Sequence, residues 1–319
     1  GRQAGLQSVH DRCCPCYIHR QLAARRSGAL CWRDRTSHSG GSTQQTSLCV
    51  SSQLQAFRMT RRPLKTVPNV ALPDLSHLTA TDFEAVYEPS DDTYLLVDAL
   101  SADATEMRHR APSLCVELGS GSGCVITHLG SLLPHAALLA GDVNLVAAAT
   151  TRATAAANGR NVDAVQLDLL ASLRPDSVDV LIFNPPYVPT SEEELAEAVA
   201  AADISAAWAG GTRGRRVLDR LLPTIGRVLA PRGLFYLLGV AENEPDEIAA
   251  LLREHHGLRC EVIAERRAQN EQLFVMRCAR EPQAVPTQPR DLRAQSASER
   301  EGVDEQEVRT ATLGGLAEG

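Results

Sequence analysis

The sequence predicts an α/β protein whose core is a mainly parallel β-sheet with one antiparallel strand. Three observations favour this fold class. Short apolar runs alternate with amphipathic stretches through the middle of the chain, and this alternation is typical of a sheet covered by helices. The run at residues 178–183 is almost wholly apolar, as in a central strand buried on both faces. The closing segment resembles a hairpin, which supplies the antiparallel strand.

The predicted elements follow in order along the chain. The strands and helices are: strand 114–118, helix 124–133, strand 136–140, helix 145–158, a short strand ending at 165–167, strand 178–183, two helical patterns, strand 233–240, helix 245–254 and the hairpin 261–267 with 272–278. Each strand is followed by a helix up to the hairpin. Parallel neighbours are expected, because a helical crossover returns the chain to the same end of the sheet.

The two ends of the chain differ from this middle part. Residues 1–58 are rich in Ser, Gln, Arg and Gly, and residues 281–319 are similarly polar. Neither segment has the period of a helix or of a strand, so both are predicted to be disordered extensions of a domain at 59–280. Because the chain begins with Gly and Met59 precedes the more structured part, residues 1–58 could also be upstream sequence that the natural protein lacks.

Charge and hydropathy exclude several classes of protein. The net charge is −7, which argues against stable nucleic-acid binding through a broad basic face. No stretch reaches the about 18 apolar residues of a membrane helix, and no secretory signal is recognisable. We therefore expect a protein of the cytoplasm, and of the nucleus as a further location, that does not bind membranes.

The nine cysteines do not predict a metal site or a disulfide framework. Within residues 1–58 one cluster has a spacing that fits no common zinc pattern: His10, Cys13, Cys14, Cys16 and His19. The cysteines of the middle part are scattered singly, which predicts separate reduced thiols: Cys115, Cys124, Cys260 and Cys278.

A glycine-rich loop follows the first predicted strand. Gly119, Gly121 and Gly123 lie where that strand turns into a helix, and residues without Cβ let a ligand approach the backbone closely. About 20 residues later Asp142 ends the next strand, where its carboxylate can accept hydrogen bonds from both hydroxyls of a ribose. Asp142 could instead be an acid that stabilises a helix N-terminus. Loop and acid fit either a nicotinamide cofactor or S-adenosylmethionine.

Two further acids flank this predicted cofactor site. Asp168 ends the third strand, where its oxygens or the amide of Leu169 could bind the edge of an adenine ring. Glu117 precedes the glycines. It either fixes the loop or receives the ammonium of a methionine moiety, and the sequence favours neither role.

The most specific motif is Asn184-Pro185-Pro186-Tyr187, directly after the strand at 178–183. The prolines stiffen the loop and remove two N–H donors, which leaves the Asn184 side-chain oxygen and the Pro185 carbonyl as acceptors. These acceptors suit a planar –NH₂ group, whose nitrogen they would hold in line with a methyl donor. The Tyr187 ring could stack on that group. An ordinary Asn-Pro turn would explain only half of the motif.

Taken together, the acid before the glycines, the ribose acid and the Asn-Pro-Pro-Tyr motif resemble the HemK family of class I methyltransferases. These enzymes methylate the glutamine of the Gly-Gly-Gln motif in peptide release factors. Residues 87–96 and 206–211 resemble segments of the eukaryotic branch, and the similarity runs from about residue 72 to 278. A bacterial-type helical domain has no room between Met59 and Tyr87, which also points to the eukaryotic branch.

The resemblance implies a Rossmann-like sheet of seven strands in the order 3-2-1-4-5-7-6, with residues 163–167 at one edge. It implies S-adenosylmethionine as cofactor and a small zinc-binding activator subunit that covers the edge strand. It also implies these cofactor contacts: Thr93, Glu117, Gly119, Asp142, Asp168, Leu169 and Asn184.

Three alternatives remain open on the sequence. Asn-Pro-Pro-Tyr also holds the adenine amine in DNA methyltransferases, although the acidic charge and the missing target-recognition domain oppose this. Related folds methylate lysine in proteins. A non-catalytic scaffold that only binds the cofactor is the alternative of another class, and the complete set of motif residues disfavours it.

Overall fold

The computed structural model describes residues 59–61, 70–201 and 204–280. The predicted extensions 1–58 and 281–319 lie outside these residues, as does the cluster of His and Cys between positions 10 and 19. In the part that is described, no group of three or more His, Cys, Asp or Glu side chains could hold a metal ion. None of the helices there is long and apolar enough to cross a membrane.

The centre of the fold is a twisted sheet of eight strands within the described residues. The strands are β1 (Thr60–Arg61), β2 (Leu114–Leu118), β3 (Ala137–Asp142), β4 (Asp163–Gln166), β5 (Val178–Phe183), β6 (Leu229–Val240), β7 (Leu258–Ala268) and β8 (Glu271–Arg280). Their spatial order is β1-β7-β8-β6-β5-β2-β3-β4. Strand β8 runs antiparallel to β6 and β7, and all other pairs are parallel.

The expected strand order is confirmed, but the expected number of seven strands is wrong by one. Counted from β2, the order is 3-2-1-4-5-7-6, with β4 at the predicted edge. The additional strand is β1, in which Thr60 pairs with Glu261 at the opposite edge. Two residues that pair with a segment about 200 positions away leave no local pattern that could predict them.

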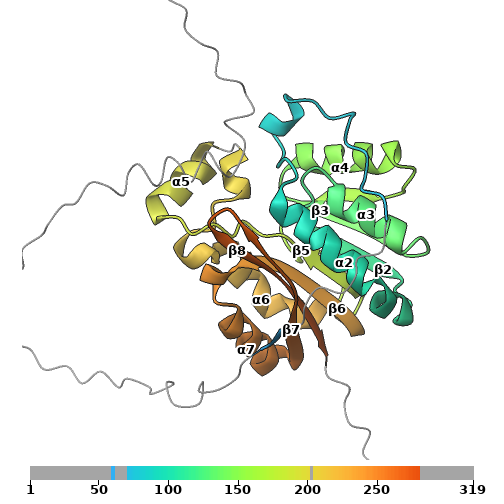
Figure 1. The fold of residues 1–319 in the computed structure, drawn as a ribbon, viewed down its shortest axis with the longest axis vertical. Coiled ribbons are helices and arrows are strands. Elements are labelled where there is room, and N and C mark those ends of the chain that lie inside the picture. The colour runs from blue at the N-terminus through green and yellow to red at the C-terminus, as the bar shows by residue number, and fades with distance from the viewer. Residues whose placement is uncertain (1–58, 62–69, 202–203, 281–319) are drawn as a thin grey trace, which may run out of the picture. The chain divides into compact units, whose positions relative to one another are not determined.

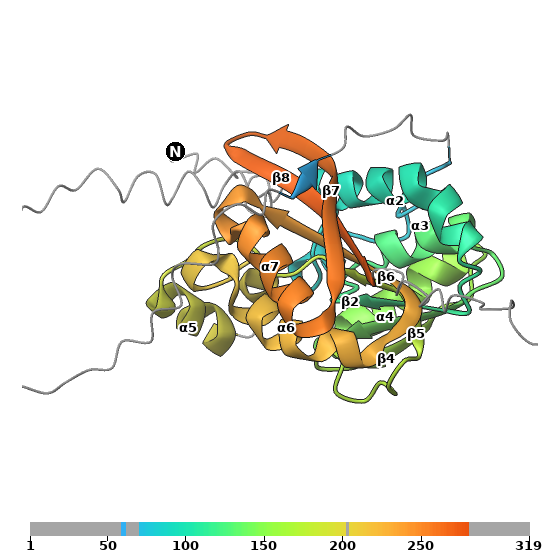
Figure 2. The same cartoon turned by 90° about the horizontal axis from the view of Figure 1, so that it is seen from below.

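Helices cover both faces of the sheet (Figures 1 and 2). Three of them, α2 (Asp91–His109), α3 (Cys124–Leu132) and α4 (Leu145–Ala157), pack against one face. On the other face lie α6 (Arg216–Val228) and α7 (Pro245–His256). The remaining helical segments are α5 (Glu192–Ala201) and the short 3-10 turns η2 (Asp82–Glu84), η3 (Ile204–Ala207), η4 (Thr212–Gly214) and η5 (Ala241–Asn243).

Strand β5 is the central strand that its apolar run predicts. Val180 and Ile182 point into the core formed with α2 and α3. Leu181 and Phe183 point into the core formed with α6 and α7. Because alternate side chains of one strand enter two cores, both faces must be apolar, and each fully buried side chain contributes roughly 1.5–3 kcal/mol.

Strand β6 begins earlier than the sequence predicts. It starts at Leu229, which pairs with Val178, and a bulge separates this pair from the next one. The residues Pro231-Arg232-Gly233 are typical of a turn, so the sequence predicts a strand only from 233 onward. Tertiary pairing with β5 overrides that local preference.

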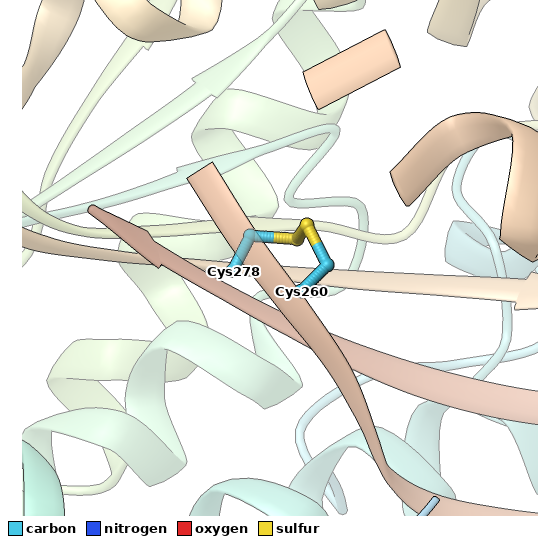
Figure 3. Close-up of a disulfide and its surroundings, with 2 residues drawn as sticks. All are labelled: Cys260 and Cys278. Carbon is cyan, nitrogen blue, oxygen red and sulfur yellow. A yellow bond between two sulfur atoms is a disulfide. The ribbon is translucent and has the colours of Figure 1, made fainter. Parts of the chain in front are cut away.

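The prediction of separate thiols is wrong for two of the four cysteines. Cys260 in β7 and Cys278 in β8 lie directly opposite each other and form a disulfide (Figure 3). Their sequence separation of 18 gives no hint of the bond, because a cross-strand pair depends on hairpin register. Cys115 and Cys124 are buried free thiols, as predicted. Burial raises the pKa of each of these thiols to about 12, so neither is a reactive thiolate at neutral pH.

Candidate active site

A cavity of about 340 Å³ opens at the carboxyl ends of β2, β3 and β5, with the segment before α2 along one side. Ligands of open α/β sheets bind in this position. Except for Gly123, the residues that the sequence singled out as cofactor or substrate contacts line this one cavity: Thr93, Glu117, Gly119, Gly121, Asp142, Asp168, Leu169, Asn184, Pro185, Pro186 and Tyr187. The structure thus brings the predicted cofactor and substrate residues together, while their individual roles stay predictions.

The glycine loop joins β2 to α3 through left-handed backbone. Gly119, Gly121 and Gly123 have φ values of 63°, 51° and 79°. A Cβ on Gly123 would lie 2.7 Å from the Thr151 Cα, so the third glycine lets α4 pack closely against the loop. A Cβ on Gly119 would meet its nearest atom only at 3.6 Å. Gly119 and Gly121 line the cavity, whereas Gly123 serves packing.

Glu117 lies at the end of β2 and is only 2% exposed. Its Oε2 accepts a hydrogen bond from the Ile126 backbone N–H at 2.9 Å, so it does fix the start of α3. Burial raises the pKa of this carboxyl well above its ordinary value of 4.5. Because Glu117 also lines the cavity, the second predicted role, binding an ammonium group, remains a prediction.

Asp142 ends β3 and holds the glycine loop to the start of α4. Its two oxygens accept hydrogen bonds from the backbone N–H groups of Gly121 at 3.0 Å and Asn144 at 2.8 Å. The N-cap of α4 is Asn144, whose side chain accepts from the Val146 N–H. Asp142 is therefore not itself the helix cap. Burial raises the pKa of Asp142 although backbone hydrogen bonds oppose the shift.

Asp168 lies beyond the strand that it was predicted to end. Strand β4 stops at Gln166, and Leu169 has a φ of 53° in the loop that follows. The Asp168 carboxylate forms an ion pair with Arg220 of α6 at 2.7 Å, and both side chains are more than half exposed. Arg220, which the sequence did not indicate, also lines the cavity.

Asn184 follows β5 and has an unusual hydrogen-bonding state. Its Nδ2 donates to Asp92 Oδ2 at 3.0 Å. Its Oδ1 is buried and has no hydrogen-bond partner among the described residues. Buried acceptors are nearly always satisfied, so an unsatisfied one at a cavity needs an explanation, and a ligand N–H would supply it.

Asp92 lines the cavity beside Asn184, a position that the sequence pattern does not reveal. By position, Asp91 and Asp92 are acids that complement the start of α2, with Ser90 as its cap. Ser90 is the N-cap residue, but its side chain makes no capping hydrogen bond. Asp91 is exposed, whereas Asp92 is 3% exposed and accepts hydrogen bonds from Asn184, Thr93 and Tyr87. Burial raises the pKa of Asp92, and the hydrogen bond from Asn184 opposes this.

Residues 208–215 form a support behind the Asn-Pro-Pro-Tyr loop, which we call the backing segment. Val188 exchanges two backbone hydrogen bonds with it, from its N–H to Trp208 and to its carbonyl from Gly210. Asn243, which is 2% exposed, donates from Nδ2 to the Tyr187 carbonyl at 2.9 Å and to the Arg213 carbonyl at 2.8 Å. The loop is therefore held from behind, and no sequence signal pointed to Asn243.

The chemistry of the lining limits what the cavity can hold. Asp92, Glu117 and Asp142 are buried carboxyl groups in the lining, and a cationic ligand would stabilise their ionised forms against the cost of burial. The acceptors around Asn184 suit N–H donors. A ligand with positive charge and hydroxyl groups fits these residues better than an anionic phosphate ester does.

Known proteins resemble the chain in sequence. Residues 90–211 match the family model described as "Methyltransferase small domain". The human protein "Methyltransferase HEMK2" is 42% identical over 213 residues, which cover 66% of this chain and 96% of that protein. The Schizosaccharomyces pombe protein "eRF1 methyltransferase catalytic subunit mtq2" is 36% identical over 225 residues, or 66% and 96% of the two chains.

One similar solved structure is the "Structure of E. cuniculi Mtq2-Trm112 complex responible for the methylation of eRF1 translation termination factor". It is 31% identical, covers 61% of this chain and 99% of its own, and has a TM-score of 0.46. The sequence relatives are decisive, because each is matched over nearly its full length at well above 30% identity. The chain belongs to the HEMK2 family, the eukaryotic branch of the HemK methyltransferases.

Proposed function

We propose that the enzyme transfers a methyl group from S-adenosylmethionine to the side-chain amide nitrogen of the glutamine in the Gly-Gly-Gln motif of a eukaryotic peptide chain release factor. The observation that carries this proposal is the buried, unpartnered Oδ1 of Asn184 at the cavity. Relatives named as methyltransferases of eRF1 or of release factor glutamine support the same substrate.

The residues around the cavity fit S-adenosylmethionine. Asp142 has acceptor capacity for the ribose hydroxyls, because an ionised carboxylate offers about four lone-pair sites and backbone N–H groups occupy only part of them. Four other predicted cofactor residues line the cavity: Glu117 and Thr93 would hold the methionine part, and Asp168 and Leu169 would bind the adenine edge. When bound, this cofactor supplies an electrophilic methyl group on a positively charged sulfur.

The Asn-Pro-Pro-Tyr loop orients the acceptor nitrogen. An amide nitrogen is a weak nucleophile because its lone pair is delocalised. The Asn184 Oδ1 and the Pro185 carbonyl would each accept one of its N–H bonds, which holds the nitrogen in one position and favours the positive charge that develops on it. Tyr187 is 7% exposed and packs into the core, so its ring offers a fixed surface for the planar amide.

We propose further that the chain works as the catalytic subunit of a heterodimer with a small zinc-binding activator. Six large apolar side chains are exposed among the described residues. Four of them lie on β4, at the start of α4 or just before that helix: Val143, Leu145, Val146 and Val165. An open sheet edge with apolar neighbours favours a covering partner. The S. pombe relative is itself named a catalytic subunit.

The test is to purify the chain with the activator, add methyl donor and release factor, and locate the methyl group by peptide mass spectrometry. We expect modification of the Gly-Gly-Gln glutamine, and none when that glutamine is replaced. Methyl groups on lysine, or on adenine in a DNA control, would support one of the rival substrates. Cofactor binding without any turnover would identify a non-catalytic scaffold.

A further inference from the structure

The side-chain amide of Asn184 can lie in two orientations, and only one of them serves the reaction. With Nδ2 toward Asp92, the oxygen is left for the substrate. Rotated by half a turn, the amide would place Oδ1 against a carboxylate oxygen and offer a donor to the substrate N–H. Nothing else on Asn184 decides between the two, because no other side-chain hydrogen bond holds its amide among the described residues.

The hydrogen bonds of Asp92 divide between its two oxygens. Oδ1 accepts from the Thr93 backbone N–H at 2.7 Å, from the Thr93 hydroxyl at 3.3 Å and from the Tyr87 hydroxyl at 3.3 Å. Oδ2 accepts from Asn184 at 3.0 Å. Since the start of α2 fixes one oxygen against a backbone donor, the other oxygen must face Asn184 as an acceptor.

We propose that Asp92 is a positioning residue, which holds the Asn184 amide with its oxygen toward the acceptor nitrogen of the substrate. This inference rests on the proposed methyl transfer for its effect on turnover. Its structural part, the orientation of the Asn184 amide, does not depend on the identity of the substrate.

Asp92→Asn keeps the shape of the side chain at position 92, but it removes the charge and changes the expected orientation of the Asn184 amide. The Thr93 N–H still requires an oxygen, so the new –NH₂ group must face Asn184. Two –NH₂ groups then oppose each other, and Asn184 rotates to accept, which presents its own –NH₂ to the substrate. The exposed neighbour offers a matched control, because Asp91→Asn makes the same chemical change one residue earlier on the same helix.

The turnover test uses the chain with its activator at saturating donor and release factor. We expect kcat of Asp92→Asn at saturating donor to fall on the order of 100-fold, and Asp91→Asn to stay within about twofold of the unaltered enzyme. The double variant Asp92→Asn with Asn184→Asp restores a donor facing an acceptor. It should exceed each single variant on the order of tenfold, a coupling that mere destabilisation does not produce.

Near-normal kcat for Asp92→Asn would overturn the proposal, and so would a double variant no faster than its two parents. If Asp92→Asn does not fold, comparing the kcat of the double variant with that of Asn184→Asp alone still tests the proposal. In Asn184→Asp the new carboxylate faces the carboxylate of Asp92, and the double variant removes this repulsion. The NMR signal of the Asn184 side-chain amide gives a measurement that needs no substrate. It is identified by its loss in Asn184→Asp. It should shift in Asp92→Asn and not in Asp91→Asn, and an unmoved signal contradicts the proposed orientation even if release factor is not the substrate.

Discussion

At the scale of single residues, the nitrogen and the oxygen of the Asn184 amide differ in their contacts. The nitrogen donates to Asp92, and the buried oxygen, which has no partner among the described residues, is the atom that we propose accepts from the substrate. We expect Asn184→Ala to lower kcat on the order of a hundredfold or more, because the lost hydrogen bond strengthens as charge develops on the acceptor nitrogen. Steady-state rates at saturating donor, with cofactor Kd from calorimetry, separate this loss from weaker cofactor binding.

Tyr187 provides a companion measurement at the same loop. Tyr187→Phe keeps the ring that packs into the core and should be milder than Tyr187→Ala, which also opens a cavity there. Melting temperatures show which variants remain folded. Near-normal methylation by a folded Asn184→Ala protein that binds cofactor would mean that the acceptor role assigned to this loop is wrong.

The buried acids of the cavity predict a pH dependence of cofactor binding. Burial raises the pKa of Glu117 and Asp142 above their ordinary values. Without cofactor, a raised carboxyl pKa stabilises the fold at low pH, and this contribution is lost as pH rises from the ordinary Glu value of 4.5 through the raised one. A cationic ligand favours the ionised carboxyls, so binding should release protons and tighten as pH rises.

Calorimetry in two buffers with different ionisation enthalpies counts the released protons directly. The increase in melting temperature caused by S-adenosylmethionine should grow with pH over the same interval. Glu117→Gln is the matched variant, since it keeps the shape but cannot ionise, and it should remove most of the proton release. Binding heats that do not depend on the buffer would contradict this assignment of charge.

The positions of site residues were predictable where place in the chain alone defines the environment. Gly119, Asp142 and Asn184 lie at the ends of strands of a parallel sheet, and all such ends meet at one edge, so the sequence places them together. The proposed role of Asp92 was not predictable, because its place in the chain does not define its environment. Its position near a helix start has an ordinary explanation, and only its contact with Asn184, 92 residues away, reveals another role.

At the scale of elements, the backing segment fixes the loop that carries Asn184. Gly214 has a φ of 67°, and a Cβ built on it would lie 1.8 Å from the Tyr187 carbonyl oxygen. Gly214→Ala must therefore push the Asn-Pro-Pro-Tyr loop away from its position. We expect a large loss of kcat together with a lower melting temperature.

Gly159 supplies a control with the same backbone strain. Its φ is 64°, and a Cβ there meets nothing within 4 Å. Gly159→Ala should destabilise by roughly 1–2 kcal/mol through left-handed backbone alone and leave kcat unchanged. If the two variants lose activity equally at matched stability, the backing segment does not position the loop.

Element boundaries were predicted well where the hydrophobic pattern and the residues that typically end an element agree. Strands β2 and β5 have the predicted bounds, because each is a mainly apolar run that ends at a Gly or Asn-Pro signal. The backing segment and its tie to Asn243 were beyond prediction, since glycines in loops have many uses and the hydrogen bonds join residues 56 positions apart.

At the scale of the whole molecule, the order of the strands followed from the family resemblance, while pairings at the far edge did not. The place of β4 at one edge is confirmed. The short β1 depends on pairing with β7, which is distant in the sequence. The Cys260–Cys278 disulfide depends on the register between β7 and β8. Register depends on turn geometry as well as on the hydrophobic pattern, and the pattern of one strand does not show which distant strand lies beside it.

The last prediction concerns the edge that β4 forms. If the activator covers the exposed apolar residues there, charges at Leu145 and Val165 should weaken the heterodimer on the order of tenfold or more. Leu145 is the first residue of α4, so Leu145→Glu adds an acid where the helix dipole favours one and should not harm the fold. Leu72→Glu is the control, because Leu72 is also more than half exposed but belongs to a segment whose Asp74 contacts Asn158, at the opposite end of α4 from Leu145. Pull-down with the tagged activator measures binding, and calorimetry checks that cofactor affinity persists. Undiminished heterodimer formation by a Leu145→Glu and Val165→Glu double variant, or equal loss with Leu72→Glu, would place the partner elsewhere on the molecule.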